Sequence, residues 1–320
     1  MIRPTRRAVT AALPAVMLAR SAAATPNTEF RVKGLTTYSE SAMVMSVSTD
    51  GRSAITLRFC RFPDAGLTWL WCHIVRDGVL YAFTQHDLPC GVERLAEGAA
   101  ADYRAAPMEA SLMRAGKGSG LRQVRIAGAL PFHRSRTAPL GPGAVNGHFK
   151  GLFTVTHALS ATVLKDRDEV YGTLSGDIAI AGQRWTHEGV AKFHEQRQIN
   201  PRFEAPFCYS WLGGEGLAAT TLLLATGATG GWLFGQTEDA LADMAADAPG
   251  DLRAIDYRLK SGRRAPGRLS AIVRYEVPIF GRPWRGSFVR GLVDGRPVVG
   301  VMNDWTAAPD IYAAAHARLG

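Results

Sequence analysis

The sequence has few cysteines and lacks the short motifs that most often mark a catalytic site. Its 320 residues include four cysteines, none of them in a CxxC pair, so neither a disulfide framework nor a zinc cluster is predicted. There is no GxSxG elbow, no phosphate-binding glycine loop leading into a lysine, and no GxGxxG motif opening a helix. The sequence therefore contains none of the motifs that would most directly indicate a hydrolase, a kinase or a nicotinamide-dependent enzyme. Spacing alone does not decide whether any cysteines are bridged; they are Cys60, Cys72, Cys90 and Cys208.

Two His-Glu pairs begin like the HExxH motif of zinc proteases but do not complete it. Four residues after His187 stands Ala191, and four residues after His194 stands Gln198. The second histidine that such a site needs on the same helical face is therefore missing in both places. We predict no metal and no cofactor.

Charge is sparse and is not gathered by sign. Charged residues make up 20% of the chain and hydrophobic residues 47%, which is enough to bury a large core. The basic residues are scattered, so a solvated surface explains them better than nucleic-acid binding does. We expect no nucleic-acid partner.

Residues 1–24 have the features of an export signal. Arg6 and Arg7 precede an apolar run, and three alanines at 22–24 offer a cleavage site. The paired arginines resemble a twin-arginine signal more than an ordinary Sec signal. Cleavage would lower the net charge from +9 to +5, because this segment holds four arginines and no acid. We expect an exported protein, either periplasmic or membrane-associated.

Period-two alternation of apolar and polar residues dominates the rest of the chain and predicts β-strands. Asp50-Gly51 and Asp77-Gly78 supply the positive φ that tight hairpin turns need. The predicted strands are 42–48, 53–61, 67–75, 79–84, 121–127, 149–155, 170–180, 217–224, 231–233, 252–259, 269–277, 286–293 and 297–302. This succession of strands is typical of an all-β protein.

Two late segments are typical of short helices. Thr237 to Asp247 opens with an N-cap residue, carries acids in its first turn and is rich in alanine. Pro309 to Leu319 has the same character. Turn-forming residues concentrate at 131–147 and at 200–206, and either stretch fits a linker or a long surface loop.

The densest group of polar residues covers positions 187–201 and includes His194 and Glu195. It fits either a solvated loop with surface ion pairs or a polar group over the mouth of a barrel. In the second case, aromatic neighbours would keep a carboxyl protonated near neutral pH, because burial raises the pKa of a carboxyl. The side chains expected to bind a ligand around it are Trp69, Trp71, His73, Trp185, Phe193, Tyr209 and Trp211. Alternation puts Trp69, Trp71 and His73 on one strand face, where core packing is the better explanation of the tryptophans.

These residues resemble a known pattern. The order Gly189, Phe193-His194-Glu195-Gln196, Pro201 and Trp211 is similar to the glycine, aromatic-His-Asp-His, proline and tryptophan succession of the carotenoid 1,2-hydratase (hydroxyneurosporene synthase) family and its AttH-type lipocalin-like relatives. The resemblance implies an all-β fold of two lipocalin-like (calycin) antiparallel barrels with short late helices. The barrels would cover residues 25–205 and 206–320.

In that family the aspartate of the motif is the proposed proton donor, and the matching residue here is Glu195. The sequence departs from the pattern because Glu replaces Asp, Gln196 replaces His and Arg197 replaces Asn. An arginine within reach of Glu195 would work against a protonated carboxyl.

The resemblance implies a cofactor-independent hydratase or lyase that protonates a C=C bond of an isoprenoid or terpenoid. Glu195 would be the acid, and His194 would orient it or the water. Two alternatives stay open: a lipocalin-like carrier of an apolar ligand, and an acid-initiated terpenoid cyclase or isomerase. In each case the expected partner is an apolar small molecule, with peripheral membrane contact as a further alternative.

The export prediction is tested by replacing Arg6 and Arg7 with lysine in the full chain. Twin-arginine transport requires the arginine pair, whereas the Sec route needs only positive charge, so we expect the double variant to be retained inside the cell. Cell fractionation and N-terminal sequencing of the exported protein measure transport and cleavage. Undiminished export of the double variant would assign the segment to the Sec route.

Overall fold

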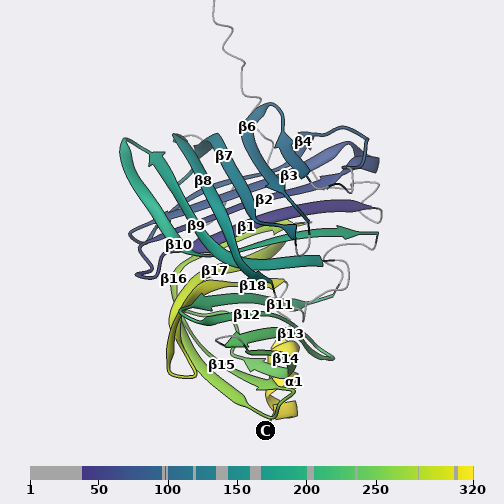
Figure 1. Ribbon diagram of the computed structural model, residues 1–320, viewed down its shortest axis with the longest axis vertical. Coiled ribbons are helices and arrows are strands. Elements are labelled where there is room, and N and C mark those ends of the chain that lie inside the picture. Colours follow the sequence, from purple (N-terminus) through teal and green to yellow (C-terminus); the bar gives the residue numbers. More distant parts are fainter. Residues whose placement is uncertain are drawn as a thin grey trace, which may run out of the picture.

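The computed structural model describes residues 38–95, 98, 100–117, 120–134, 143–158, 167–199, 205–234, 237–279, 281–305 and 309–319. The predicted export signal lies outside these residues. Two antiparallel β-structures make up almost all of the described chain, one above the other in Figure 1. The all-β prediction is therefore confirmed.

The first structure is a ten-stranded sheet that curls over its own core. Its strands are β1 (Ser39–Val47), β2 (Ser53–Phe62), β3 (Leu67–Arg76), β4 (Val79–Pro89), β5 (Ala100–Ala105), β6 (Met108–Ala115), β7 (Gln123–Phe132), β8 (Val145–Ala158), β9 (Arg167–Ile180) and β10 (Gln183–Gln198), with a 3-10 turn η1 (Pro63–Ala65) between β2 and β3. The strand order is β4-β3-β2-β1-β10-β9-β8-β7-β6-β5, so β10 lies in the middle of the sheet. A backbone bridge between Ala82 and His133 links β4 to the end of β7 and draws the two halves together.

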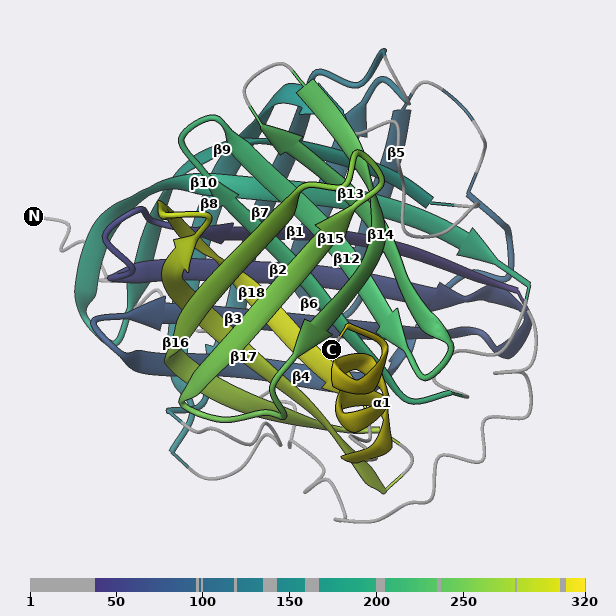
Figure 2. The ribbon, with the colours of Figure 1, turned by 90° about the horizontal axis from the view of Figure 1, so that it is seen from below.

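The second structure is a closed eight-stranded barrel. Its strands are β11 (Phe207–Gly214), β12 (Leu217–Leu224), β13 (Gly227–Phe234), β14 (Thr237–Ala246), β15 (Leu252–Leu259), β16 (Arg264–Ile279), β17 (Arg282–Val293) and β18 (Arg296–Trp305). The single described helix, α1 (Pro309–Leu319), was predicted with these bounds and lies beside the barrel in Figure 2. Its residues Ile311, Tyr312 and Ala315 belong to the barrel core. The predicted boundary between residues 205 and 206 falls between β10 and β11.

The helix predicted over Thr237 to Asp247 is wrong, because this segment forms β14. Strand β14 pairs with β13 on one side and β15 on the other, and the barrel does not close without it. A bulge between Leu241 and Asp243 breaks the simple alternation that would have identified a strand. Pairing on both sides outweighs the helix propensity of its alanines.

The polar segment 187–198 is a buried strand and not a solvated loop. It forms most of β10, which pairs with β1 along one edge and with β9 along the other. The turn-rich stretch 131–147 connects β7 to β8 inside the first sheet, so it is not a linker between domains. Strands β5, β6 and β11 were not predicted.

Three apolar cores result from this arrangement. One lies inside the first sheet, one inside the barrel, and the third lies between the two structures. The third core joins the outer faces of β1 to β4 to β11, β16, β17 and β18, and it contains most of the buried tryptophans. The two structures are therefore held together by a continuous aromatic layer.

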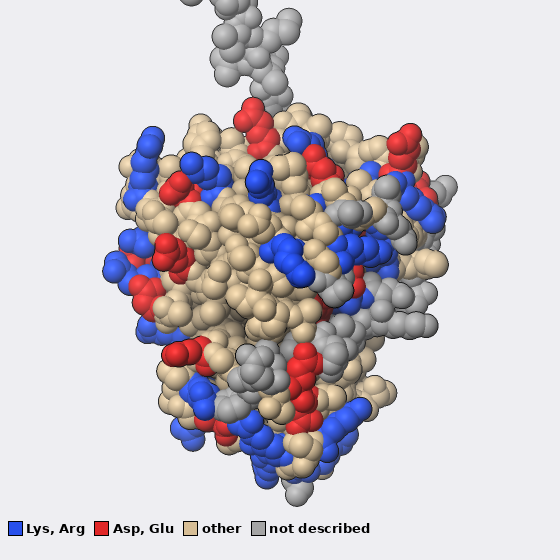
Figure 3. All heavy atoms as spheres, viewed as in Figure 1, with Lys and Arg blue, Asp and Glu red and all other residues tan. Residues whose placement is uncertain are grey.

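All four cysteines are free thiols in the structure, and no bridge joins them. Cys60 belongs to the core between the two structures, whereas Cys72 belongs to the core inside the first sheet. Within the described part of the chain, no helix has the length and hydrophobicity needed to cross a bilayer. On the face shown in Figure 3, basic and acidic side chains are interspersed.

Gly189 allows β10 to approach β1 closely. A Cβ atom at this position would lie 2.5 Å from the backbone oxygen of Val47. We expect Gly189→Ala to lower the free energy of unfolding by about 1–3 kcal/mol, because the two central strands must move apart. Gly91→Ala is the matched control, since a Cβ there meets nothing within 4 Å. Equal urea midpoints for the two variants would contradict this role of Gly189.

Candidate functional site at the junction of the two barrels

The alternation of side chains along β10 divides the predicted site between two faces of the first sheet. Phe193 and Glu195 point into the core that the sheet encloses, whereas Lys192 and His194 point outward toward the barrel. Successive residues of a strand face opposite sides. The prediction that His194 orients the Glu195 carboxyl is therefore wrong.

Glu195 is buried, but both of its oxygens are occupied as acceptors. Arg114 donates from Nε to Oε2 at 2.6 Å, and the Tyr103 hydroxyl donates to Oε1 at 2.6 Å. Arg114 is itself held by the backbone oxygens of Gly98 and Gly116. Burial and the negative charge of Glu195 raise the pKa of Tyr103 far above its ordinary value.

This geometry removes the apolar setting that a proton-donating Glu195 requires. The sequence placed Arg197 as the arginine that would decide the question, but the ion pair is made by Arg114 from β6. A buried carboxylate held by a guanidinium is a structural ion pair. The structure does not support Glu195 as the acid of a catalytic site.

The opposite face of β10 carries a second buried polar cluster. Lys192 is fully buried, and its Nζ atom donates to Oε1 of Glu169 at 2.7 Å and to the Tyr209 hydroxyl. Arg167 approaches the same Glu169 oxygen at 2.9 Å and hydrogen-bonds the His194 ring. Strands β9, β10 and β11 thus bring together an amine, a carboxylate, a phenol, a guanidinium and an imidazole. We call these five residues the junction cluster.

Burial changes the acid–base properties of the junction cluster. It lowers the pKa of Lys192 to about 7, although the Glu169 carboxylate acts in the other direction. Burial also raises the pKa of Tyr209 well above its ordinary value, and the charge on Glu169 adds to this effect. An amine that changes protonation state near neutral pH can serve as an acid or as a base.

The aromatic residues predicted around the ligand line the contact between sheet and barrel. Trp69, Trp71 and His73 share one face of β3, as predicted, and this face packs against the barrel. Trp211 and Tyr209 approach from β11. The ring of Trp71 lies 4.7 Å from that of Trp284 at an angle of 39° and stacks on Trp69 at 6.1 Å, so these rings form a packed layer.

His73 and Trp211 have different polar environments within this layer. The Trp211 indole donates to the Met45 sulfur at 3.1 Å. Both ring nitrogens of His73 are buried without a hydrogen-bond partner among the described residues, and its ring lies 4.4 Å from that of Tyr275. Burial lowers the pKa of His73 to about 3, which keeps the ring neutral.

Trp185 and Phe193 lie on the other side of the sheet from the junction cluster. Phe193 is part of the core inside the first sheet, and Trp185 packs at its edge. The Trp185 indole donates to the Ser53 hydroxyl, which also bonds the buried His187 ring. These two predicted ligand residues therefore do not join the others.

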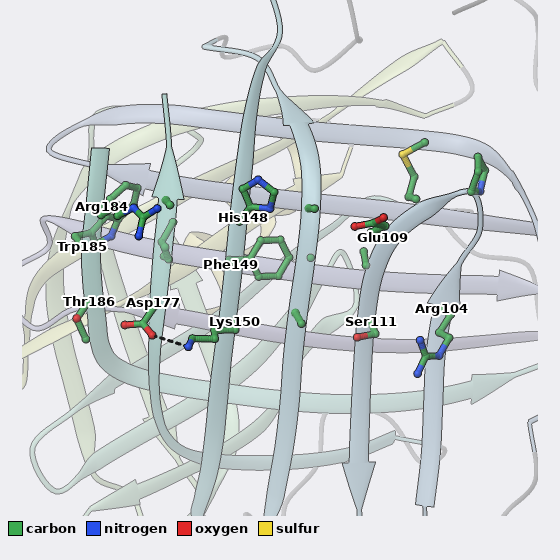
Figure 4. A pocket seen from close by; sticks show the side chains of 18 of the residues that line it. Arg104, Glu109, Ser111, His148, Phe149, Lys150, Asp177, Arg184, Trp185 and Thr186 are labelled. Carbon is green, nitrogen blue, oxygen red and sulfur yellow. Dashed lines mark ion pairs between the residues drawn. The ribbon is translucent and has the colours of Figure 1, made fainter. Parts of the chain in front are cut away.

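A groove of about 1090 Å³ crosses the outer face of β6 to β10, as Figure 4 shows. Its rim carries Arg104, Glu109 and Arg184, and an ion pair of 3.2 Å joins Lys150 to Asp177. The two side chains of this pair are 75% and 63% exposed, so solvent screens their charges. The groove lies on the same face as the junction cluster but at the other ends of β9 and β10, and it lacks a comparable buried set of titratable groups.

Among the described residues, no three His, Cys, Asp or Glu side chains come together in an arrangement that would hold a metal. The polar segment that the sequence singled out carries both Glu195 and Lys192, on opposite faces of β10. Once this stretch is known to be a strand, alternation predicts that His194 shares the face of Lys192, and the pairing with β9 places Glu169 opposite His194. Arg167 and Glu169 gave no such signal, because they lie more than twenty residues earlier.

Solved structures with the same arrangement confirm the fold. A putative AttH protein from Nitrosomonas europaea matches with a TM-score of 0.56 and 10% identity, over 84% of this chain and 92% of that one. CghA solved with Sch210972 matches with a TM-score of 0.53 and 12% identity, over 84% and 88%. The chain has the fold of these AttH-type proteins. No protein-family model and no curated protein matches the sequence.

The Glu195–Arg114 pair predicts a large effect on stability. Arg114→Met leaves a buried carboxylate without its cation, so we expect a loss of about 3–5 kcal/mol in the free energy of unfolding. Tyr103→Phe removes one hydrogen bond and should cost about 2 kcal/mol. Denaturant titration of both variants measures the difference.

The double variant Arg114→Met with Glu195→Met is the control, because it leaves no unpaired buried charge. We expect it to recover much of the loss. A double variant as unstable as Arg114→Met alone would show that the side chains contribute through packing and not through their charges.

Proposed function

We propose that the protein is a cofactor-independent enzyme of the lyase or isomerase class that moves protons on a small apolar molecule. The reaction takes place at the junction cluster. The observation that carries this proposal is the buried Lys192 amine, which contacts Glu169 and the Tyr209 hydroxyl next to the aromatic layer between sheet and barrel.

Each residue of the junction cluster has its own role in proton transfer. Lys192 in its neutral form accepts a proton and returns it in its charged form, since its pKa lies near 7. The Tyr209 hydroxyl on β11 accepts a hydrogen bond from the amine and relays protons between the amine and the barrel side of the junction. Glu169 fixes the amine in position, and Arg167 fixes the orientation of the His194 ring.

The surroundings suit an apolar ligand that carries few polar atoms. The tryptophans of the aromatic layer, with Tyr209 and Trp211, offer ring faces that stabilise a developing positive charge. A relative in fold, CghA, was solved with the small molecule Sch210972. Hydration of an isoprenoid C=C bond is the reaction we propose to test first, and cyclisation or simple binding are its alternatives.

The test uses the full chain, acyclic isoprenoids and water enriched in heavy oxygen. Label in the product identifies hydration, and an unlabelled rearranged product identifies isomerisation or cyclisation. Either product supports proton transfer at this site. Binding without any turnover would contradict the enzymatic proposal and leave a carrier.

We expect Lys192→Met to lower turnover by at least 100-fold while ligand binding persists, because general acid–base catalysis contributes about 10²–10⁴-fold. Lys150→Met is the matched control, since this lysine lies exposed in the groove far from the cluster. If neutral Lys192 is the base, the rate rises with pH through about 7, where the amine loses its proton. Unchanged turnover in Lys192→Met would remove this residue from the mechanism.

A further inference from the structure

We infer that the substrate is an apolar α,β-unsaturated aldehyde or ketone, and that the Lys192 amine binds its carbonyl carbon covalently. This inference rests on the proposed function and names the substrate class of the same site. It follows from three features of the described residues: the burial of a lysine at position 192, the contacts of its amine, and the ion pairs of the buried acids.

The choice of lysine is unusual in this chain. Six of its 37 basic residues are lysines, and the rest are arginines. Of the four described lysines, Lys117, Lys150 and Lys260 are exposed and Lys192 is buried. Arginine keeps its charge in every setting, whereas a buried lysine can become a neutral amine. Arginine is the cation in the buried pairs of Glu40, Glu195 and Asp304, whereas Glu169 contacts a lysine as well as an arginine.

The contacts of the amine fit the formation of an imine. Glu169 Oε1 lies 2.7 Å from Nζ and can take the proton that the amine loses. The Tyr209 hydroxyl lies next to Nζ, where a carbonyl oxygen needs a proton before it leaves as water. Buried lysines beside such groups are the usual nucleophiles of Schiff-base chemistry.

The ion pairs of the buried acids do not favour protonation of an isolated alkene by a carboxyl. Every buried carboxylate of the described residues is paired with an arginine: Glu40 with Arg61, Glu169 with Arg167, Glu195 with Arg114 and Asp304 with Arg253. These carboxylates are therefore partners in buried ion pairs. A C=C bond conjugated to an iminium ion does not need a strong acid, because the iminium withdraws electrons from it.

The proposed sequence balances in atoms and charge. The Lys192 amine adds to the C=O carbon, and the oxygen takes one proton from the amine and one from the cluster and leaves as water to give an iminium ion; the cluster recovers its proton when the iminium ion is hydrolysed. Water then adds to the β-carbon, one of its protons passes to the cluster, and the α-carbon takes a proton in return. Hydrolysis of the imine releases the amine and a β-hydroxy carbonyl product, so the net reaction consumes one water.

The experiment traps the imine on the full chain. The protein is incubated with citral, an acyclic isoprenoid enal, and reduced with sodium borohydride at pH 7, and the adduct is located by peptide mass spectrometry. We expect one adduct per chain, on Lys192, with none in Lys192→Met and an unchanged yield in Lys150→Met. The preference for Lys192 over the exposed Lys150 and Lys260 should exceed tenfold at pH 7 and fall toward pH 10.

This pH comparison is made within the parent chain, so it holds even where a variant folds poorly. An equal distribution of adducts over all lysines at pH 7, or no adduct on Lys192, would overturn the covalent step. The heavy-oxygen experiment then separates the two proposals. Label from a hydrocarbon isoprenoid without any trapped imine would retain proton transfer at the junction and reject the carbonyl substrate.

Discussion

The alternation of side chains along a single central strand decides which chemistry is available on each side of the first sheet. Strand β10 is paired along both edges, so its backbone cannot rotate to bring neighbouring residues onto one face. Glu195 consequently faces a closed core, and Lys192 and His194 face the barrel. Two adjacent residues that look like one catalytic pair in the sequence belong to two separate polar clusters in the structure.

The pairing of acids with arginines is the second constraint on this molecule. A carboxylate buried without a cation would cost several kcal/mol, so each buried acid needs a partner of fixed charge. The partners come from distant strands, and they tie those strands together: Arg114 of β6 reaches Glu195 of β10, and Arg253 of β15 reaches Asp304 of β18. Lys192 differs from these arginines because it can release its proton. Burial lowers the pKa of Lys192 to about 7, so this pair includes a cation that can lose its proton near neutral pH.

Much of the fold could be predicted because strands leave a local signal. Period-two alternation and Asp-Gly turns identified most strands, and the shared face of Trp69, Trp71 and His73 followed from alternation alone. The strand over Thr237–Ala246 could not be recognised, since a bulge and a run of alanines hide its period. Its conformation is set by the need to close the barrel, which is a tertiary effect.

The candidate site was harder to predict than the fold. The polar composition of residues 187–201 made this segment a candidate. The partners of Glu195, however, are Arg114 and Tyr103, which lie 81 and 92 residues away from it in the sequence. No local pattern reports which guanidinium meets which carboxylate, because the contact depends on the order of strands in the sheet. The alternation of side chains along β10 then decides that the amine of Lys192, and not the carboxyl of Glu195, meets the barrel.

Titration of the lysine side chains by nuclear magnetic resonance tests this account most directly. With ¹³C placed at the ε-carbon of all six lysines, one resonance should titrate near pH 7 and disappear in Lys192→Met. If no lysine resonance titrates near pH 7, Lys192 is a permanently charged partner of Glu169, and no reactive amine exists at the junction of the two barrels.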